Sequence, residues 1–324
     1  MPRKPVRRVG RAGRRARATR SCADAPREAR GLVDRPPLTD ASAGFTGPPS
    51  GGFGRLSFGF LAVSVVSGVA LVPFYAPASA WESLERIEGG LAWGFFLRAL
   101  HAYASFGVLV AAALHVVQVL AAKTERQLPA GVWWRSVVLL PVTVAALLGG
   151  FVLRGDAEAV AALAIWRRLL EIVPALGVET ARLLLGSAPP GLGPAALHHA
   201  GTFTLLLWLL TAEHAGRMFP DVRGTVLAGL VSAALAGTIP LPLGVPPSAS
   251  PAHLLGPWSL LGLQGALVVL PPWVGWLAPL ALVVLLGFVR HAAGHARKTL
   301  IALIAVWLLG YACFTVRVLL SARG

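Results

Sequence analysis

Long apolar runs separated by short polar ones occupy most of the chain. Seven such runs lie near 56–75, 95–120, 136–153, 199–216, 223–242, 274–290 and 299–319. About 20 apolar residues in an α-helix cross the hydrocarbon core of a bilayer, which is roughly 30 Å thick. Hydrophobic residues make up 56% of the chain and charged residues 13%, which excludes an ordinary soluble domain. The pattern predicts an all-α integral membrane protein with about seven spans.

Histidines recur at matched intervals inside two of these runs. His101 and His115 are fourteen residues apart in the second run, and His199 and His214 are fifteen apart in the fourth. An α-helix rises about 1.5 Å and turns about 100° per residue, so each interval brings two side chains close to one face, roughly 21 Å apart. Two such helices packed against each other would offer one imidazole from each side at two depths. The spacing predicts bis-histidine ligation of two haem irons in a four-helix bundle, with three further transmembrane helices.

A single intramembrane histidine is more simply explained by a structural hydrogen bond, and the haem interpretation depends on the repeated spacing. His199 is preferred to its neighbour His198, because fifteen residues before His214 keep the helix face better than sixteen. The remaining histidines lie in or beside predicted loops, where we expect them to be solvated: His253, His291 and His295.

Small residues repeat with the same period in two other runs. Gly54 and Gly68 are fourteen residues apart in the first run, as are Ser136 and Gly150 in the third. Small residues also serve plain helix packing in membranes. A flat macrocycle wedged between helices needs neighbours without bulky side chains, and the shared period favours these four positions as contacts of the cofactors.

The first fifty residues differ sharply in composition. Positions 1–35 contain twelve Arg or Lys residues against three acidic ones, which is +9 of the total charge of +15. We expect a disordered basic tail, and on a membrane protein such a tail contacts anionic lipid rather than nucleic acid. The chain is therefore divided into a tail over 1–50, a di-haem four-helix domain over 51–218 and a three-helix membrane domain over 219–324.

Loop charges predict the orientation in the membrane. The segment at 76–94 contains Glu82, Glu85 and Glu88 against one arginine. The loops on the side of the tail carry mostly cations: Lys123, Arg126, Arg217, Arg223, Arg290, Arg297 and Lys298. Because cytoplasmic loops are enriched in Lys and Arg, we expect a cytoplasmic N-terminus in the cell membrane. His101 and His199 would then lie near the outer face, and His115 and His214 near the inner one.

Several segments between about residues 52 and 220 carry a family resemblance: "SGVALVPFYAP", "FFLRALHAYASFGVLVAAALHVVQVL", "ALLGGFVL", "LLLGSAPPG" and "LHHAGTFTLLLWLLTAEHAG". They resemble the cytochrome b subunits of bc-type and bf-type quinol-oxidising complexes. The fifteen-residue spacing is similar to the bf type, and the seven spans resemble its cytochrome b fused to its three-span partner subunit. The resemblance implies an outer haem on His101 and His199, an inner haem on His115 and His214, and a haem propionate near Arg98.

The chain departs from the family at positions that bear on chemistry. Gln118 replaces an arginine, and Pro194 and Ala195 stand where the family has an arginine just before the helix histidine. Leu255–Ser259 is the best match to the Pro-Glu-Trp-Tyr motif of the outer quinol site, and it lacks the glutamate. The loop over 243–273 offers only His253 as a titratable group, which puts quinol oxidation of the usual kind in doubt.

The leading hypothesis is the di-haem cytochrome b subunit of a divergent quinol:cytochrome c oxidoreductase, which would not be active alone. The resemblance implies two haem b groups, quinone as substrate, and a homodimeric complex with a Rieske iron–sulfur protein and a c-type cytochrome. Neither Cys22 nor Cys313 lies in a Cys-x-x-Cys-His motif, so we expect non-covalent haem. The alternative is a di-haem membrane anchor that passes electrons between quinone and another peripheral oxidoreductase. A third, non-redox possibility is a scaffold or transporter subunit without haem.

Overall fold

The computed structural model describes residues 52–186, 191–249 and 253–322, and the basic tail expected over 1–50 lies outside them. Within the described residues every regular element is a helix. Three of the four bundle helices are continuous: α3 (Gly52–Leu71), α5 (Gly94–Ala122) and α6 (Ala130–Val152). The fourth consists of α9 (Gly193–Leu197), a π-helical turn η4 (His198–Phe203) and α10 (Thr204–Ala215). The expected all-α membrane bundle is confirmed.

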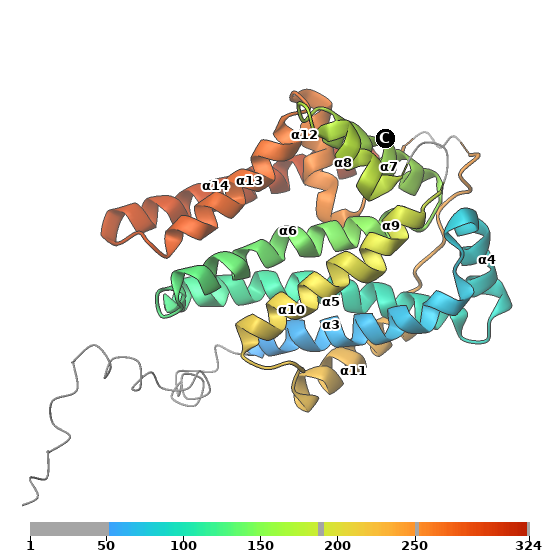
Figure 1. Ribbon diagram of the computed structural model, residues 1–324, viewed down its shortest axis with the longest axis horizontal. Helices are drawn as coiled ribbons and strands as arrows, with labels where there is room; N and C mark the ends of the chain where they lie inside the picture. The colour runs from blue at the N-terminus through green and yellow to red at the C-terminus, as the bar shows by residue number, and fades with distance from the viewer. Residues whose placement is uncertain (1–51, 187–190, 250–252, 323–324) are drawn as a thin grey trace, which may run out of the picture. The chain divides into compact units, whose positions relative to one another are not determined.

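The four bundle helices run side by side, as Figure 1 shows. Helix α3 packs on α5, and α6 packs on both α10 and α5. Helices α5 and α10 face each other across the middle of the bundle and are not among the closely packed pairs. The matched histidine spacing predicts that these two helices pack directly against each other. They lie diagonally instead, with small residues of α3 and α6 beside them.

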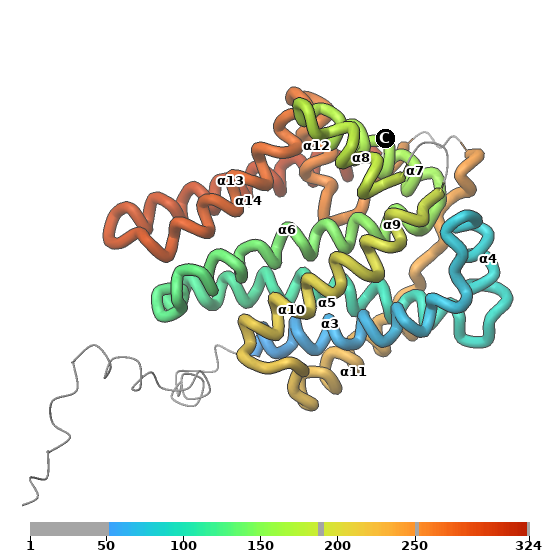
Figure 2. The backbone as a smooth tube through the Cα atoms, in the orientation of Figure 1, coloured from blue at the N-terminus to red at the C-terminus, as the bar shows by residue number. Residues whose placement is uncertain are grey.

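Three further apolar helices follow the bundle: α11 (Val222–Thr238), α13 (Val274–Val289) and α14 (Gly294–Ser321). Helix α11 packs on α3 and α5, and α13 packs on α6. A short helix, α12 (Leu261–Val269), begins after the turn η5 (Trp258–Leu260) and packs on α14. Figure 2 lets the reader follow this path from α11 to the end of the chain.

Five helices in the described part of the chain are long and apolar enough to cross a membrane. They correspond to five of the seven expected spans, while α11 and α13 have 17 and 16 residues. At about 1.5 Å per residue, these two are roughly 25 Å long. Prolines set their limits: Pro240 forces Ile239 into an extended conformation after α11, and Pro271 and Pro272 precede α13.

Short helices form the connections at the end of the bundle near Leu71 and Val152. Between α3 and α5 lie η1 (Val72–Phe74), η2 (Pro77–Ser79) and α4 (Ala80–Gly90), and between α6 and α9 lie α7 (Ala157–Glu171) and α8 (Gly177–Leu185). Asp156 caps α7, because its side chain accepts a hydrogen bond from the backbone N–H of Ala159 at 2.8 Å.

Close packing of α3 uses an aromatic contact on one side and a glycine contact on another. Phe58 on α3 is 1% exposed and meets Trp208 on α10 edge-on, with ring centroids 5.4 Å apart. A Cβ at Gly59 would lie 2.5 Å from the carbonyl oxygen of Gly224, so only glycine lets α11 approach α3 this closely. Such van der Waals contacts hold membrane helices together, since lipid tails are as apolar as the side chains.

Arginines tie the α5–α6 connection to the α13–α14 connection. The α5–α6 connection includes a short turn, η3 (Thr124–Arg126). Arg290 donates to the carbonyl oxygen of Leu128 at 2.5 and 2.8 Å, and Arg126 donates to that of Ala292. Arg297 pairs with the fully buried Glu125 at 2.9 Å. We call this group of contacts the arginine junction.

Candidate haem-binding site

Each histidine of α5 faces a histidine of the fourth helix. The ring centroids of His101 and His199 are 6.1 Å apart, and those of His115 and His214 are also 6.1 Å apart. All four side chains are partly buried. The structure therefore brings together both pairs that the spacing predicts, one at each level of the bundle.

The pair geometry fits a metal held between two imidazoles. A ligating imidazole nitrogen lies about 2 Å from a first-row metal, which places a ring centre roughly 3 Å from it and two opposed rings roughly 6 Å apart. No group of three or more His, Cys, Asp or Glu side chains gathers in the described part of the chain to complete a coordination sphere. Two opposed imidazoles suit a haem iron, whose other four ligands come from the porphyrin.

Hydrogen bonds orient three of the four rings. The Nδ1 of His101 donates to the backbone carbonyl of Ser64 at 2.9 Å, and the Nδ1 of His199 donates to that of Ala146 at 2.9 Å. A carbonyl accepts only, so both rings carry their proton on Nδ1 and keep the lone pair of Nε2 for a metal.

The third ring is oriented through a hydroxyl. The Nδ1 of His214 lies 2.7 Å from the Oγ of Ser136. That hydroxyl donates its own proton to the carbonyl of Val132 at 2.8 Å, so it accepts from His214. The carbonyls that accept from His101 and His199 lie four residues before a predicted small residue, Ser64 before Gly68 and Ala146 before Gly150. For His214 the small residue itself, Ser136, is the acceptor, and it donates to the carbonyl of Val132 four residues earlier.

The four predicted small residues lie directly beside the histidines. A Cβ at Gly68 would be 2.9 Å from Cε1 of His101, and one at Gly54 would be 3.0 Å from Cε1 of His115. A Cβ at Gly150 would be 2.9 Å from Cε1 of His199. Distances below 3.0 Å are hardly ever seen for real Cβ atoms. The small residues therefore lie against the paired rings, and their contact with the cofactors stays a prediction. The fourteen-residue period does not mark the neighbouring Gly149, whose Cβ would lie 3.3 Å from His199.

The π-helical turn η4 explains how the fifteen-residue interval from His199 to His214 can give the same side-chain direction as the fourteen-residue interval from His101 to His115. In a straight α-helix, fourteen residues end about 40° short of four turns and fifteen end about 60° beyond them. The two intervals are therefore not nearly equal in a straight helix, as the spacing alone suggests, but differ by about 100°. A π-helical turn accommodates one additional residue, and the hydroxyl of Thr204 donates to the carbonyl of His199 at 2.7 Å, five residues earlier. His199 and His214 thereby keep the relative direction of the first pair.

The other histidines do not form facing pairs. The Nδ1 of His198 lies 3.0 Å from the hydroxyl of Thr202, and its Nε2 lies 3.2 Å from the carbonyl of Leu183. The remaining three are exposed, in keeping with the expectation from their loops: His253, His291 and His295.

Arg98, expected near a haem propionate, forms a two-pronged ion pair with Glu88. Its Nε and terminal nitrogen lie 2.6 and 3.0 Å from the two carboxylate oxygens, and it also donates to the carbonyl of Leu241. The arginine lies three residues before His101 on the same helix. Its part in neutralising a propionate stays a prediction.

The segment that resembles the outer quinol motif lies against the bundle. Trp258 meets Phe106 of α5 edge-on, with centroids 5.7 Å apart, and lines a cavity of about 360 Å³ with Leu109 and Tyr311. The hydroxyl of Tyr311 donates to the carbonyl of Ser259 at 2.5 Å. Among the residues that the structure describes, no acidic side chain lines this cavity.

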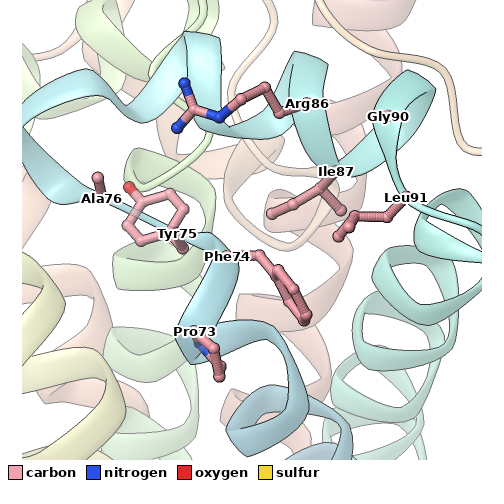
Figure 3. Close-up of a pocket in the computed structure, with 8 residues that line it drawn as sticks. All are labelled: Pro73, Phe74, Tyr75, Ala76, Arg86, Ile87, Gly90 and Leu91. Atoms are coloured by element: carbon pink, nitrogen blue, oxygen red, sulfur yellow. The ribbon is translucent and has the colours of Figure 1, made fainter.

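A second cavity, of about 410 Å³, lies between the end of α3 and α4 (Figure 3). It is lined by Pro73, Phe74, Tyr75, Ala76, Arg86, Ile87, Gly90 and Leu91. Tyr75 donates its hydroxyl to the carbonyl of Leu153 at 2.7 Å, and burial raises its pKa above the usual value. None of the paired histidines lines this cavity, so it is separate from the candidate site.

Known proteins share both the sequence pattern and the fold. The model of the family described as Cytochrome b/b6/petB matches residues 50–214. The menaquinol:cytochrome c reductase cytochrome b subunit of Bacillus subtilis (strain 168) is 30% identical over 139 residues, which are 41% of this chain and 61% of that protein. The protein of the same name from Geobacillus thermodenitrificans is 29% identical over 171 residues, covering 51% and 74%.

A chain of the solved structure titled "Hyperthermophilic respiratory Complex III" superposes with a TM-score of 0.61 at 18% identity, and 84% of each chain is covered. This likeness concerns the fold. The family resemblance drawn from the sequence is confirmed, because the family model spans residues 50–214 of the 324, just over half, and this range includes all four paired histidines. The chain belongs to the cytochrome b/b6 family and is an integral membrane protein that binds haem b.

Proposed function

We propose that this chain is the di-haem cytochrome b subunit of a quinol:cytochrome c oxidoreductase and carries electrons across the membrane. The observation that supports this most directly is the pair of facing imidazole couples, each with ring centroids 6.1 Å apart. Fourteen helical residues separate the two levels by roughly 21 Å, against a hydrocarbon core of roughly 30 Å. Two such levels suffice to connect both faces of the bilayer.

The protein's own part in this function is to hold and orient. When bound, haem supplies one-electron iron chemistry. His101 and His199 form the outer couple, and His115 and His214 form the inner one. The carbonyls of Ser64 and Ala146 hold the Nδ1 protons, which directs the Nε2 lone pairs toward the centre of the bundle. The apolar helices around them exclude water and lower the local dielectric.

The partners and the orientation follow from the same proposal. A Rieske iron–sulfur protein and a c-type cytochrome would dock at the outer face, quinone would be the membrane substrate, and the complex would be a homodimer in the cell membrane. The arginine junction and Lys123 lie at the end of the bundle that carries His115 and His214, while Glu82, Glu85 and Glu88 lie at the other end. The enrichment of cytoplasmic loops in Lys and Arg supports a cytoplasmic N-terminus.

A pyridine haemochrome assay on the purified chain tests the proposal, and we expect two haem b groups per chain with two components in a redox titration. The variant His199→Ala should lose one haem, because an imidazole couple cannot form with one ring. His198→Ala is the matched control and should keep both, since the hydrogen bonds of His198 among the described residues go to Thr202 and the Leu183 carbonyl. A wild-type chain with one haem or none, or two haems in His199→Ala, would contradict the proposal.

The π-helical turn leads to a second prediction. Deleting Gly201 should convert η4 into α-helix and shorten the interval to fourteen residues, so both haems should be retained. The matched control deletes Ala113 from α5, which has no π-turn to absorb the change, so His101 and His115 would rotate by about 100° relative to each other. That variant should lose one haem in the same assay. Loss of a haem from the Gly201 deletion would show that η4 does not set the register.

A second candidate function rests on one observation. The motif-like segment contains Pro257, Trp258 and Ser259 without the expected glutamate, and the described residues that line the adjoining cavity include no acidic side chain. The chain would then serve as a di-haem anchor between quinone and a different peripheral oxidoreductase. Isolating the native complex distinguishes the two: an iron–sulfur partner with quinol-dependent reduction of cytochrome c supports the first, and a different redox partner without this activity supports the second.

A further inference from the structure

One of the four paired histidines lacks the hydrogen bond that orients the others. His101 and His199 donate to backbone carbonyls, and His214 donates to Ser136. The Nδ1 of His115 is buried, and it has no hydrogen-bond partner among the residues that the structure describes. An unpaired buried donor or acceptor costs about 1–3 kcal/mol.

The carbonyls of Ser64, Ala146 and Val132 each lie four residues before a small residue of the neighbouring helix, and they hold the other three rings directly or through the hydroxyl of Ser136. His115 lies beside Gly54 of α3, and no described residue accepts a hydrogen bond from it in this way.

A free acceptor lies within the same turn of α5. The Oε1 of Gln118 is also buried and also lacks a hydrogen-bond partner within the described residues. Residues three apart are neighbours on a helix surface, so the Gln118 side chain can reach the His115 ring. The two groups do not meet hydrogen-bond geometry in this structure, but a side-chain rotation would satisfy both unpaired atoms at once.

We propose that Gln118 is the positioning residue of His115, with its Oε1 accepting the Nδ1 proton of the ring. This bond would fix the tautomer and leave the Nε2 lone pair directed toward His214. The inference rests on the proposed function, because it concerns the haem between His115 and His214. The side-chain amide of Gln118, on the same helix as His115, would thus orient this ring, whereas groups on neighbouring helices orient the other three.

The proposal predicts a change confined to one haem. An acceptor on Nδ1 makes the imidazole more basic and favours ferric iron. Gln118→Leu removes the acceptor and should raise the midpoint potential of the inner haem, and Gln118→Glu supplies a stronger acceptor and should lower it. We expect about a tenfold change in the relative affinity for ferric over ferrous iron, which is 59 mV for a one-electron couple. The other redox component should stay unchanged.

A spectroelectrochemical titration of the purified full chain tests this, with Gln127→Leu as the matched control at an exposed position. Opposite shifts of one component in the two variants support the proposal. Loss of that haem from Gln118→Leu with retention in Gln118→Glu also supports it, because glutamate keeps an acceptor. The Gln118 proposal is overturned if neither redox component shifts, if both components shift together, or if both Gln118 variants lose the haem. Fewer than two haems in the wild-type chain would instead refute the proposed function itself.

Discussion

Replacing Gly68 by valine is expected to halve the haem content of the purified chain. A Cβ at this position would already lie 2.9 Å from Cε1 of His101, and valine adds two methyl groups whose χ1 freedom in a helix is small. The imidazole would be pushed out of its couple with His199, and the outer haem would lose its site. A pyridine haemochrome assay gives the ratio of haem to protein, and a redox titration shows which component is missing.

The matched control for this variant is Gly237→Val. Gly237 lies in α11, and a Cβ there would meet nothing within 4 Å among the described residues apart from its own stretch of helix backbone, so the same substitution should leave both haems in place. Retention of two haems with unchanged potentials in Gly68→Val would refute the role assigned to Gly68, which is to leave room for the His101 ring.

Replacing Glu125 by alanine should lower the stability of the folded bundle by about 3–5 kcal/mol, because it leaves the charge of Arg297 buried without its partner. The Glu125 side chain is 0% exposed and that of Arg297 is 11% exposed, with 2.9 Å between the two charged atoms. Arg297 also donates to the carbonyl of Leu120 at 2.6 Å, which holds the guanidinium in place. Unfolding in increasing concentrations of a denaturing detergent measures the difference.

The control for the Glu125 variant is Glu179→Ala. Its ion pair with Arg182 is exposed, with side chains 69% and 62% accessible, and such surface pairs contribute about 0–1 kcal/mol. A double variant with leucine at both Glu125 and Arg297 should be more stable than Glu125→Ala, since no unpaired charge remains. Equal stability of Glu125→Ala and the wild type would show that the arginine junction does not hold the two connections together.

The apolar runs predict the helices well, because hydrocarbon admits few other structures for the backbone. The spacing of His101 and His115 also leads directly to a couple at each level, and the shared period of Gly54 and Gly68 leads to their place beside the rings. These features repeat with the helix period, so they can be read without knowing which helices are neighbours.

Other features depend on contacts that no local pattern records. The diagonal placement of α5 and α10 is set by the packing of α3 and α6 between them. The backbone oxygens of Ser64 and Ala146 leave no signature in side-chain chemistry, and the π-helical turn differs from an α-helix by one residue. Prolines flank α11 and α13 in the sequence, but the apolar pattern alone does not show that they limit the length of these two helices.

Because main-chain oxygens hold the rings of His101 and His199, the side chains at Ser64 and Ala146 can change without removing the acceptor. An alanine scan of these helices would therefore overlook the groups that orient the ligands. Only a change that displaces the peptide unit itself, such as a proline in the following turn, would expose their contribution. A scaffold of this kind can accept many amino-acid substitutions while keeping its metal-binding geometry.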